Sequence, residues 1–559
     1  MSTLPGMPSF LKRFKFRHLL PVMLVLAAMV WIAGNRPGQN KSKEEDQIII
    51  NAIKFRELLS LIHTDYIDKT DTDSLADAAL TTLIEELDPH SVYIPKKEVF
   101  EGTTQLESQF EGIGAEFQFI EDTIWVSALT EDSPSEKAGL QIGDKILKVN
   151  RIPISGVNIS HQEITSLVRG PKGSQCMLEI LRKGEKGQIT VPVVRDKIRS
   201  KSLDYAGFAE NGVGYIKCSR FTQNTGAEMR EALIELLSRG MKSLVLDLRD
   251  NQGGYVSAAV KVADEFLAEN QLIVFTEGRN PEHNSRTLAG AAGLFESGNL
   301  VVLINENTAS AAEIVTGALQ DNDRALVVGR RSFGKGLVQA PITLTDGSVV
   351  RLTISRYFSP SGRCIQKGYQ RRKRQAYFKE TESRPAMAVR DTMKLKGRPF
   401  FRTRLGRKVP GGGGIIPDIA LSRDSILQDE KVNRRVDKPV LYSFLLRYFN
   451  DHKSELKKLG IQGFADGFEF NDKTNRELLT HLQNYGTEMP EGEFIKMKPA
   501  LNQYMKAGLA RCIWPEEGFF RVMQNQDREM KRALSLAPKS KKTLEHLAAL
   551  KNKEFKNSD

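Results

Sequence analysis

"NLVVLINENTASAAEIVTGALQ", residues 299–320, has the pattern of an apolar strand, a short polar turn and an amphipathic helix. Ser310 lies where the predicted helix begins. A hydroxyl at such a place commonly caps a helix, because it accepts a hydrogen bond from an otherwise unpaired backbone N–H. A nucleophilic serine is the alternative, yet none of the eight histidines of the chain lies close to Ser310 in sequence. Such a serine would need a base of another kind.

The segments on either side of this stretch alternate between strand and helix patterns. Strands separated by helices of this length are typical of βαβ crossovers, so we predict a mainly parallel sheet. Ligands of such sheets gather at the carboxyl ends of the strands, and the turn 250–254 and Ser310 both lie at such ends. The predicted strands are 212–221, 242–249, 271–277 and 300–305, and the predicted helices are 225–239, 255–268 and the one that opens at Ser310.

The turn after one predicted strand, "LDLRDNQGG" (246–254), ends in the glycine pair Gly253 and Gly254. Glycines let backbone N–H groups approach a ligand closely, because no Cβ stands in the way. We therefore expect these amides to be able to face an oxyanion.

A second motif, "SFGKGLVQ" (332–339), places Lys335 between two glycines and before apolar residues. Lysine ordinarily has a pKa near 10.4, and lowering it to about 7 requires about 4–5 kcal/mol, which complete burial can supply. Gln339 lies four residues further on, on the same face of a strand, where its carbonyl can orient the amine. An exposed turn lysine is the plainer alternative, since lysine is seldom buried.

The N-terminal residues have the features of a membrane-targeting segment. Four basic residues between Lys12 and Arg17 precede the uncharged apolar stretch Leu19–Ala33. A cleaved signal peptide and an uncleaved signal-anchor both fit, and Trp31 and Ile32 near the would-be cleavage site favour the anchor. The basic flank predicts that the rest of the chain lies outside the cytoplasm. We expect a bacterial envelope protein with a periplasmic body, anchored in the inner membrane or released into the periplasm.

The remaining chain divides into modules of different pattern. The expected order is a tail, anchor and linker over 1–45, a helical unit over 46–105, a β-rich module over 106–197, the strand–helix core over 198–425 and a helical region over 426–559. The four cysteines are widely spaced without a CxxC pair, so we predict no zinc site and leave their pairing open.

Most of the net charge lies in a basic insertion, residues 369–410. It holds fourteen Lys and Arg against three acidic residues, which is +11 of the +12 net charge. A solvated loop and a surface for anionic lipid or an acidic partner are both compatible with this composition, and no nucleic-acid partner is expected.

Several separated motifs together resemble the C-terminal processing, or tail-specific, serine peptidases. In chain order they are "RGPKGS", "LDLRDNQGG", "TASAAEI", "SFGKGLVQ" and "SPSGRCIQ" followed by "GIIPDI". This is the order of that family, apart from the basic insertion. The resemblance covers roughly Asp46 to Leu421 and implies an α/β core of the crotonase-like, ClpP-like βαβ type with an inserted PDZ-like β-rich domain. It implies no cofactor and no metal.

The resemblance also implies roles for individual residues. Ser310 is then the nucleophile, Lys335 the general base and Gln339 its orienter. The oxyanion hole uses the N–H of Ala311 and of one glycine of the Gly253–Gly254 pair, with Gly254 preferred.

The β-rich module is similar to a PDZ domain through "FEGIGAEF" (110–117). In this motif Gly112, Ile113 and Gly114 form the loop that receives a peptide's C-terminal carboxylate while the peptide adds as a strand. Arg169 is a candidate carboxylate or gating residue, with a plain turn arginine as the alternative.

The implied function is a serine endopeptidase that processes or degrades envelope proteins from their C-terminal tails. An oligomeric assembly is compatible with this function. A catalytically silent PDZ scaffold and a non-peptidase hydrolase on a crotonase-like core are the alternatives. The sequence departs from the family at the basic insertion and at Cys364, where the family often has a small hydroxylic residue.

Overall fold

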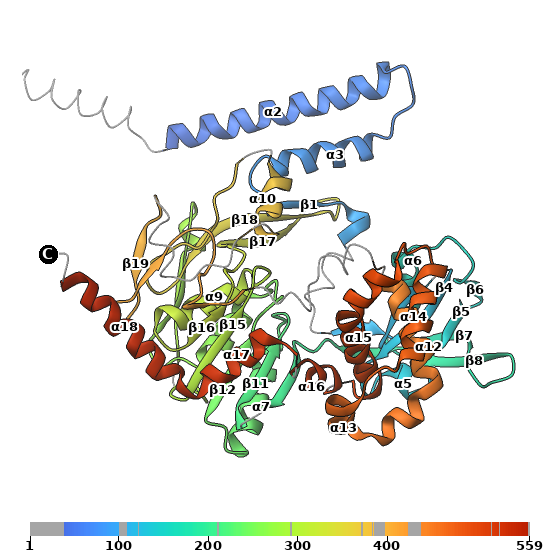
Figure 1. Ribbon diagram of the computed structural model, residues 1–559. Helices are drawn as coiled ribbons and strands as arrows, with labels where there is room; N and C mark the ends of the chain where they lie inside the picture. The colour runs from blue at the N-terminus through green and yellow to red at the C-terminus, as the bar shows by residue number, and fades with distance from the viewer. Residues whose placement is uncertain are drawn as a thin grey trace, which may run out of the picture. The chain divides into compact units, whose positions relative to one another are not determined.

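The computed structural model describes residues 38–556 apart from 100–108, 121, 210–211, 291–292, 371–372, 383, 385–396, 423–435, 437, 516 and 525. The chain divides into two compact units, Met1–Leu83 and Ile84–Asp559. In the first unit the structure describes α2 (Gly38–Asp65) and most of α3 (Thr72–Glu85), so the described part of this unit is helical (Figure 1).

The predicted membrane segment Leu19–Ala33 lies outside the described residues. Among the helices that are described, none combines the length and the apolar character needed to cross a bilayer.

The core of the second unit is a six-stranded sheet. Its order is β10 (Leu203–Phe208), β11 (Gly214–Cys218), β12 (Ser243–Asp247), β15 (Asn299–Ile304), β16 (Leu326–Gly329) and β21 (Ile419–Ala420). All neighbours pair in parallel except β10 with β11. This confirms the predicted parallel sheet and sets the turns after β12 and β15 side by side at one edge.

Both faces of this sheet are buried, which explains why its strands are apolar throughout rather than alternating. Leu244 and Leu246 of β12 pack with α7 (Thr225–Ser238), α8 (Val256–Asp264) and α9 (Ala311–Asp321). Val245, which points to the opposite face, packs with residues of α16 (Gly518–Gln524), α17 (Arg528–Leu536) and α18 (Ser540–Lys556) (Figure 1).

A second, antiparallel sheet carries part of the candidate site. It consists of β1 (Val92–Ile94), β18 (Val349–Phe358), β13 (Leu272–Gly278) and β14 (Ser285–Leu288), with β17 (Leu337–Thr343) also paired to β18. Segment 271–277, which the strand–helix alternation assigns to the parallel sheet, belongs here instead. It turns back through η5 (Pro281–His283) and pairs antiparallel with β14, so no helical crossover follows it.

The β-rich module predicted over 106–197 is built on a six-stranded sheet. The sheet order is β3 (Ala115–Ile120), β4 (Thr123–Leu129), β5 (Lys145–Val149), β7 (Gln175–Leu181) and β8 (Gln188–Val194), with β6 (Ile152–Pro153) beside β5. Helices α5 (Pro134–Lys137) and α6 (His161–Val168) complete it, and β2 (Gln109–Gly112) pairs with β9 (Asp196–Arg199) where the chain enters and leaves. Ile124 and Val126 of β4 point into the module's own core.

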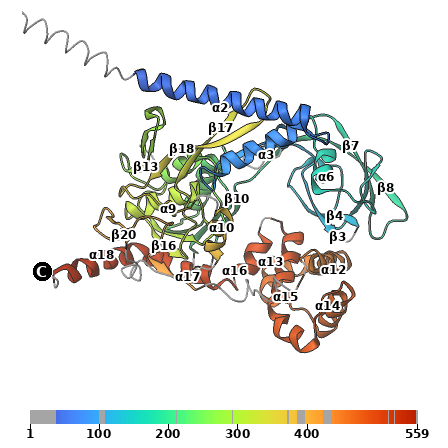
Figure 2. The same cartoon turned by 90° about the horizontal axis from the view of Figure 1, so that it is seen from above.

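The helices of the C-terminal region divide between two cores. Helices α12 (Lys438–Lys458), α13 (Gly460–Gly467), α14 (Asp472–Asn484) and α15 (Glu491–Ile513) form one bundle (Figure 2). Ile120 and Trp125, on the outer face of the β-rich module, share a hydrophobic cluster with this bundle.

Helices α17 and α18 join the core sheet instead, and α16 contributes to both cores, since its Val522 belongs to the cluster of the bundle and its Phe520 to that of the sheet. Phe520 of α16 stacks on Tyr205 of β10 with ring centroids 3.7 Å apart. Arg249, which follows β12, pairs with Asp527 at 2.6 Å and with Glu529 at 3.2 Å. The C-terminal segment is thus part of the sheet's second face.

Candidate active site

Ser310 occupies a strained turn between β15 and α9. Its backbone has φ 55° and ψ −117°, a left-handed conformation that costs a residue other than glycine about 1–3 kcal/mol. Such strain persists only where the surroundings fix it. Gly253 lies directly against this turn, because a Cβ built there would meet the Ser310 Cβ at 2.8 Å and the Ala309 carbonyl at 2.9 Å.

The two turns at the carboxyl ends of β12 and β15 are tied together. Asp250 receives a hydrogen bond from Asn305 Nδ2 at 2.8 Å and donates its own N–H to Asn305 Oδ1 at 2.9 Å. The Ala309 N–H donates to the Asn251 carbonyl, also at 2.9 Å. These bonds hold the glycine pair against Ser310, as their shared position at the sheet edge predicts.

The backbone N–H groups beside Ser310 differ in their availability. The Gly253 N–H donates to Asn251 Oδ1 at 2.8 Å and is therefore occupied. The N–H groups of Gly254 and Ala311 donate to no acceptor in the described part of the protein. This difference favours Gly254 over Gly253 as the partner of Ala311 in an oxyanion hole.

Lys335 is held by the glutamine four residues further on. Its Nζ donates to Gln339 Oε1 at 2.8 Å, and Gln339 Nε2 donates to the His90 carbonyl. Because the amide nitrogen of Gln339 is used by His90, its oxygen must face the lysine. Lys335 precedes β17, and the pairing of β17 with β18 has a register shift between Val338 and Gln339. Burial, and then the charge of Arg351, lower the pKa of Lys335.

The histidine next to this pair is a weak proton acceptor. The His90 ring is hydrogen-bonded to the Tyr377 hydroxyl, with 2.8 Å between Nε2 and the hydroxyl oxygen. Burial first, and the nearby charge of Lys335 second, lower the pKa of His90 to about 3. Its ring is therefore neutral, and its carbonyl is the group that contacts Gln339.

Glu313 anchors both the serine turn and the lysine loop. Its carboxylate accepts the Ser310 N–H at 2.9 Å, the Lys335 N–H at 2.9 Å, the Gly334 N–H at 2.7 Å and the Ser332 hydroxyl at 2.5 Å. The side chain is buried, and burial raises the pKa of Glu313 to about 7 in spite of these four donors.

Tyr357 of β18 makes a second link between the two residues. Its hydroxyl contacts the Ser310 carbonyl at 3.1 Å and the Lys335 carbonyl at 2.7 Å. The described structure records no direct hydrogen bond between the Ser310 and Lys335 side chains. Catalytic hydrogen bonds often tighten only when substrate is bound, so the backbone links are what set this pair's approach.

The predicted carboxylate loop of the β-rich module also has unused donors. The Gly114 carbonyl accepts from Thr130 N–H at 3.0 Å and the Ile113 carbonyl from Ser135 N–H at 2.9 Å. Within the described residues, the N–H groups of Ile113 and Gly114 themselves reach no acceptor. The loop leads into β3, which among the described strands pairs only with β4.

Two further residues of the predicted loop site have mainly packing contacts. Gly112 pairs with Asp196 in the β2–β9 ladder. The Arg169 guanidinium lies over the Phe110 ring, 4.9 Å from its centroid, and a Cβ at Gly112 would meet Arg169 Cγ at 3.7 Å. Arg169 therefore borders the loop.

The sequence reasoning missed Glu313, Tyr357 and His90. Glu313 carried a readable signal, because a serine followed three residues later by glutamate is the pattern of a capping box. Tyr357 and His90 carried none, since Tyr357 reaches the site from β18 and His90 from the bend before β1, both remote in sequence from Ser310.

Models of known families match three parts of the chain. Peptidase family S41 matches residues 212–371, a PDZ domain matches 125–182, and a family of unknown function matches 432–515. The last of these falls on the bundle of α12–α15.

Individual relatives agree with these matches. A probable CtpA-like serine protease of Staphylococcus aureus strain N315 is 33% identical over 362 residues, which cover 64% of this chain and 71% of the relative. A carboxy-terminal-processing protease of Bartonella bacilliformis is 35% identical over 317 residues, covering 56% of this chain and 72% of the relative. The solved photosystem II D1 C-terminal processing protease has 28% identity and a TM-score of 0.32, covering 55% of this chain and 82% of its own.

The fold and these matches define a PDZ-containing serine peptidase. The chain belongs to peptidase family S41, within its carboxy-terminal-processing class of hydrolases.

We expect Glu313→Gln to lower both stability and activity. A glutamine oxygen can keep two of the four donors, and each buried donor left without an acceptor costs about 1–3 kcal/mol. Urea unfolding and kcat/KM on a tail peptide measure the two effects. Glu231→Gln, the same change on an exposed face of α7, is the control. Equal unfolding midpoints and rates for Glu313→Gln and wild type would contradict the anchoring role.

Proposed function

We propose that this peptidase uses Ser310 as nucleophile, Lys335 as general base and Gln339 as the residue that orients the lysine. The observation that carries the proposal is the half-buried Lys335 side chain, whose amine donates to Gln339 at 2.8 Å, on a loop that shares one carboxylate with the serine turn. A lysine in such surroundings can be neutral and accept a proton.

The chemistry follows from these positions. Neutral Lys335 takes the Ser310 proton as Oγ attacks the scissile carbonyl, and the oxyanion that forms is met by the Gly254 and Ala311 N–H groups. The ammonium then gives the proton to the leaving amine, and a water activated by the same lysine releases the acyl group. Gln339 limits the amine to one direction throughout.

The substrates we propose are protein chains recognised at their C-termini. The unused Ile113 and Gly114 N–H groups suit a terminal carboxylate, and the free edge of β3 suits an added peptide strand. We further propose that the basic N-terminal flank and the apolar Leu19–Ala33 segment place the enzyme in the bacterial envelope, where its substrates would be envelope proteins.

Ser310→Ala should abolish peptide-bond cleavage without unfolding the protein, because only the attacking oxygen is removed. Mass spectrometry of envelope proteins from cells with wild type or Ser310→Ala reads which C-termini change. A purified Ser310→Ala enzyme that cleaves a tail peptide at the wild-type rate would assign the attack to another residue.

The pH dependence should report the lysine. Since burial lowers the pKa of Lys335, kcat/KM should rise with pH along a limb whose midpoint lies below the ordinary lysine value of about 10.4, as the neutral amine becomes populated. Lys335→Arg should be as inactive as Lys335→Ala, because a guanidinium stays protonated. Gln339→Ala should retain more activity than either. Substantial turnover by Lys335→Arg at pH 8 would rule out this mechanism.

Tail recognition should depend on the free carboxylate. Amidating the C-terminus of a peptide should weaken its binding to the Ser310→Ala protein by about 1.5–3 kcal/mol, the contribution of hydrogen bonds to a charged group. Calorimetry with matched free and amidated peptides measures this difference. Equal affinities for the free and the amidated peptide would contradict recognition of the C-terminal carboxylate by the 112–114 loop.

A further inference from the structure

The two segments that flank the basic insertion are hydrogen-bonded to each other, and we call this junction with the core the neck. The Gly412 N–H donates to the Cys364 carbonyl at 2.8 Å, and the Gly413 N–H to the Gln366 carbonyl at 3.2 Å. The described parts of the insertion include α10 (Arg374–Glu382) and the hairpin of β19 (Phe400–Arg402) and β20 (Lys408–Pro410).

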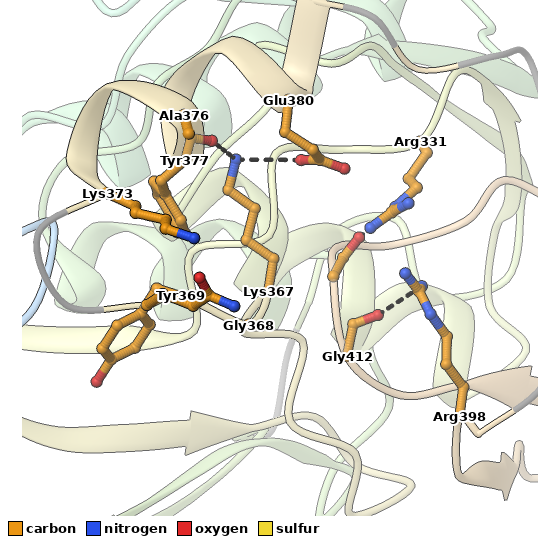
Figure 3. A pocket seen from close by; sticks show the side chains of 12 residues that line it. Arg331, Lys367, Gly368, Tyr369, Lys373, Ala376, Tyr377, Glu380, Arg398 and Gly412 are labelled. Carbon is orange, nitrogen blue, oxygen red and sulfur yellow. Dashed lines mark hydrogen bonds and ion pairs between the residues drawn. The ribbon is translucent and has the colours of Figure 1, made fainter.

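A cavity of about 440 Å³ lies at this neck. Both ends of the insertion line it, together with Arg331 of the core. Figure 3 shows the guanidinium groups of Arg331 and Arg398 next to each other and the Lys367 amine beside α10. The charged lining residues are Arg331, Lys367, Lys373 and Arg398, with Glu380 as the only acidic one among the described lining residues.

The two arginines are held by backbone carbonyls rather than by carboxylates. Arg398 Nη1 donates to the Gly412 carbonyl at 2.8 Å, and Arg331 Nε donates to the Gly413 carbonyl. Neither guanidinium forms an ion pair with any residue that the structure describes. A guanidinium has five N–H donors, so each keeps several that the recorded bonds do not use.

The single carboxylate of the lining does not neutralise the pocket. Glu380 pairs with Arg384 at 2.5 Å and with Lys367 at 3.4 Å. Burial, followed by the charges of Arg384 and Arg398, lowers the pKa of Arg331 to about 9. Burial and Arg384 likewise lower the pKa of Lys367 to about 8. Both shifts arise first from burial and then from neighbouring positive charge, and an anion in this space would offset the second contribution.

We propose that this pocket binds a phosphate group. The planar donor fork of a guanidinium matches the oxygens of an oxyanion, and a doubly charged group with several acceptors suits two adjacent guanidinium groups. The amine of Lys367 adds charge but no free donor, because it donates to the Tyr377 carbonyl, the Thr381 hydroxyl and Glu380. The same chemistry is offered by free phosphate and by the headgroup of an anionic lipid.

The pocket shares its wall with the loop of the proposed base. The Tyr377 carbonyl accepts from Lys367 Nζ at 2.7 Å, while the Tyr377 hydroxyl contacts His90, whose carbonyl holds Gln339. The Tyr377 side chain would therefore separate a bound phosphate from His90, whose carbonyl positions Gln339.

Calorimetry with inorganic phosphate and the full-length protein tests the site. We expect saturable binding that Arg398→Gln weakens at least tenfold and that Arg402→Gln, an exposed position on the neighbouring β19, leaves unchanged. Vesicles of phosphatidylglycerol and of phosphatidylcholine form the second arm. Each variant is compared with wild type on both, so that the N-terminal segment contributes equally.

The outcomes separate the sources. Arg398-dependent binding of inorganic phosphate supports a free phosphate ligand, and Arg398-dependent binding to phosphatidylglycerol vesicles alone supports a lipid headgroup. Absence of both, or equal losses in Arg398→Gln and Arg402→Gln, overturns the proposal. It is also overturned if C-terminally amidated hexaglutamate binds in an Arg398-dependent manner and phosphate does not compete. Because binding is the readout, the result is independent of Ser310 and Lys335.

Discussion

The proposed site depends on the hydrogen bonds that the buried side chain of Glu313 accepts. The carboxylate accepts hydrogen bonds from the backbone of Ser310 and from the backbone of Lys335, two residues on separate loops. A hydrogen bond to a carboxylate is roughly twice as strong as one between neutral groups, so one side chain fixes both loops. This arrangement also explains how Ser310 can keep a left-handed backbone. The strain is opposed by bonds that the turn could not form in a relaxed conformation.

The sheet supplies the second constraint. Since both faces are covered, the strands cannot slide or tilt without exposing apolar side chains. The turns at the carboxyl ends of the strands are therefore held in place as well. The C-terminal helices take part in this cover, and Asp527 and Glu529 of that segment pair with Arg249, just before the glycine turn. A segment that carries no catalytic motif therefore supports the loop that provides the proposed oxyanion donors.

Much of this could be predicted from the sequence because the information was local. Strand and helix patterns, the glycine pair and the Lys335–Gln339 spacing each depend on neighbouring residues. The assignment of 271–277 failed because an apolar strand looks alike in either sheet, and only its partner β18 decides the matter. Tyr357 and His90 were missed for the same reason: each reaches the site through long-range pairing. The division of the C-terminal helices could not be predicted either, since amphipathic spacing shows that a face is buried but not against what.

A lysine base, the role proposed for Lys335, makes the surroundings more demanding than a histidine would. A histidine has a pKa near neutrality in water, whereas a lysine must lose about three pKa units through burial before it can accept a proton at neutral pH. Burial of the amine must therefore come with a polar partner that accepts a hydrogen bond without adding a negative charge, because a carboxylate would raise the pKa again. The neutral amide of Gln339 meets this condition, and the His90 carbonyl ensures that its oxygen is the atom presented. A similar separation holds at Tyr377: the amine of Lys367, just before the insertion, lies over the Tyr377 ring, 4.0 Å from its centroid, while the neutral Tyr377 hydroxyl contacts the His90 ring.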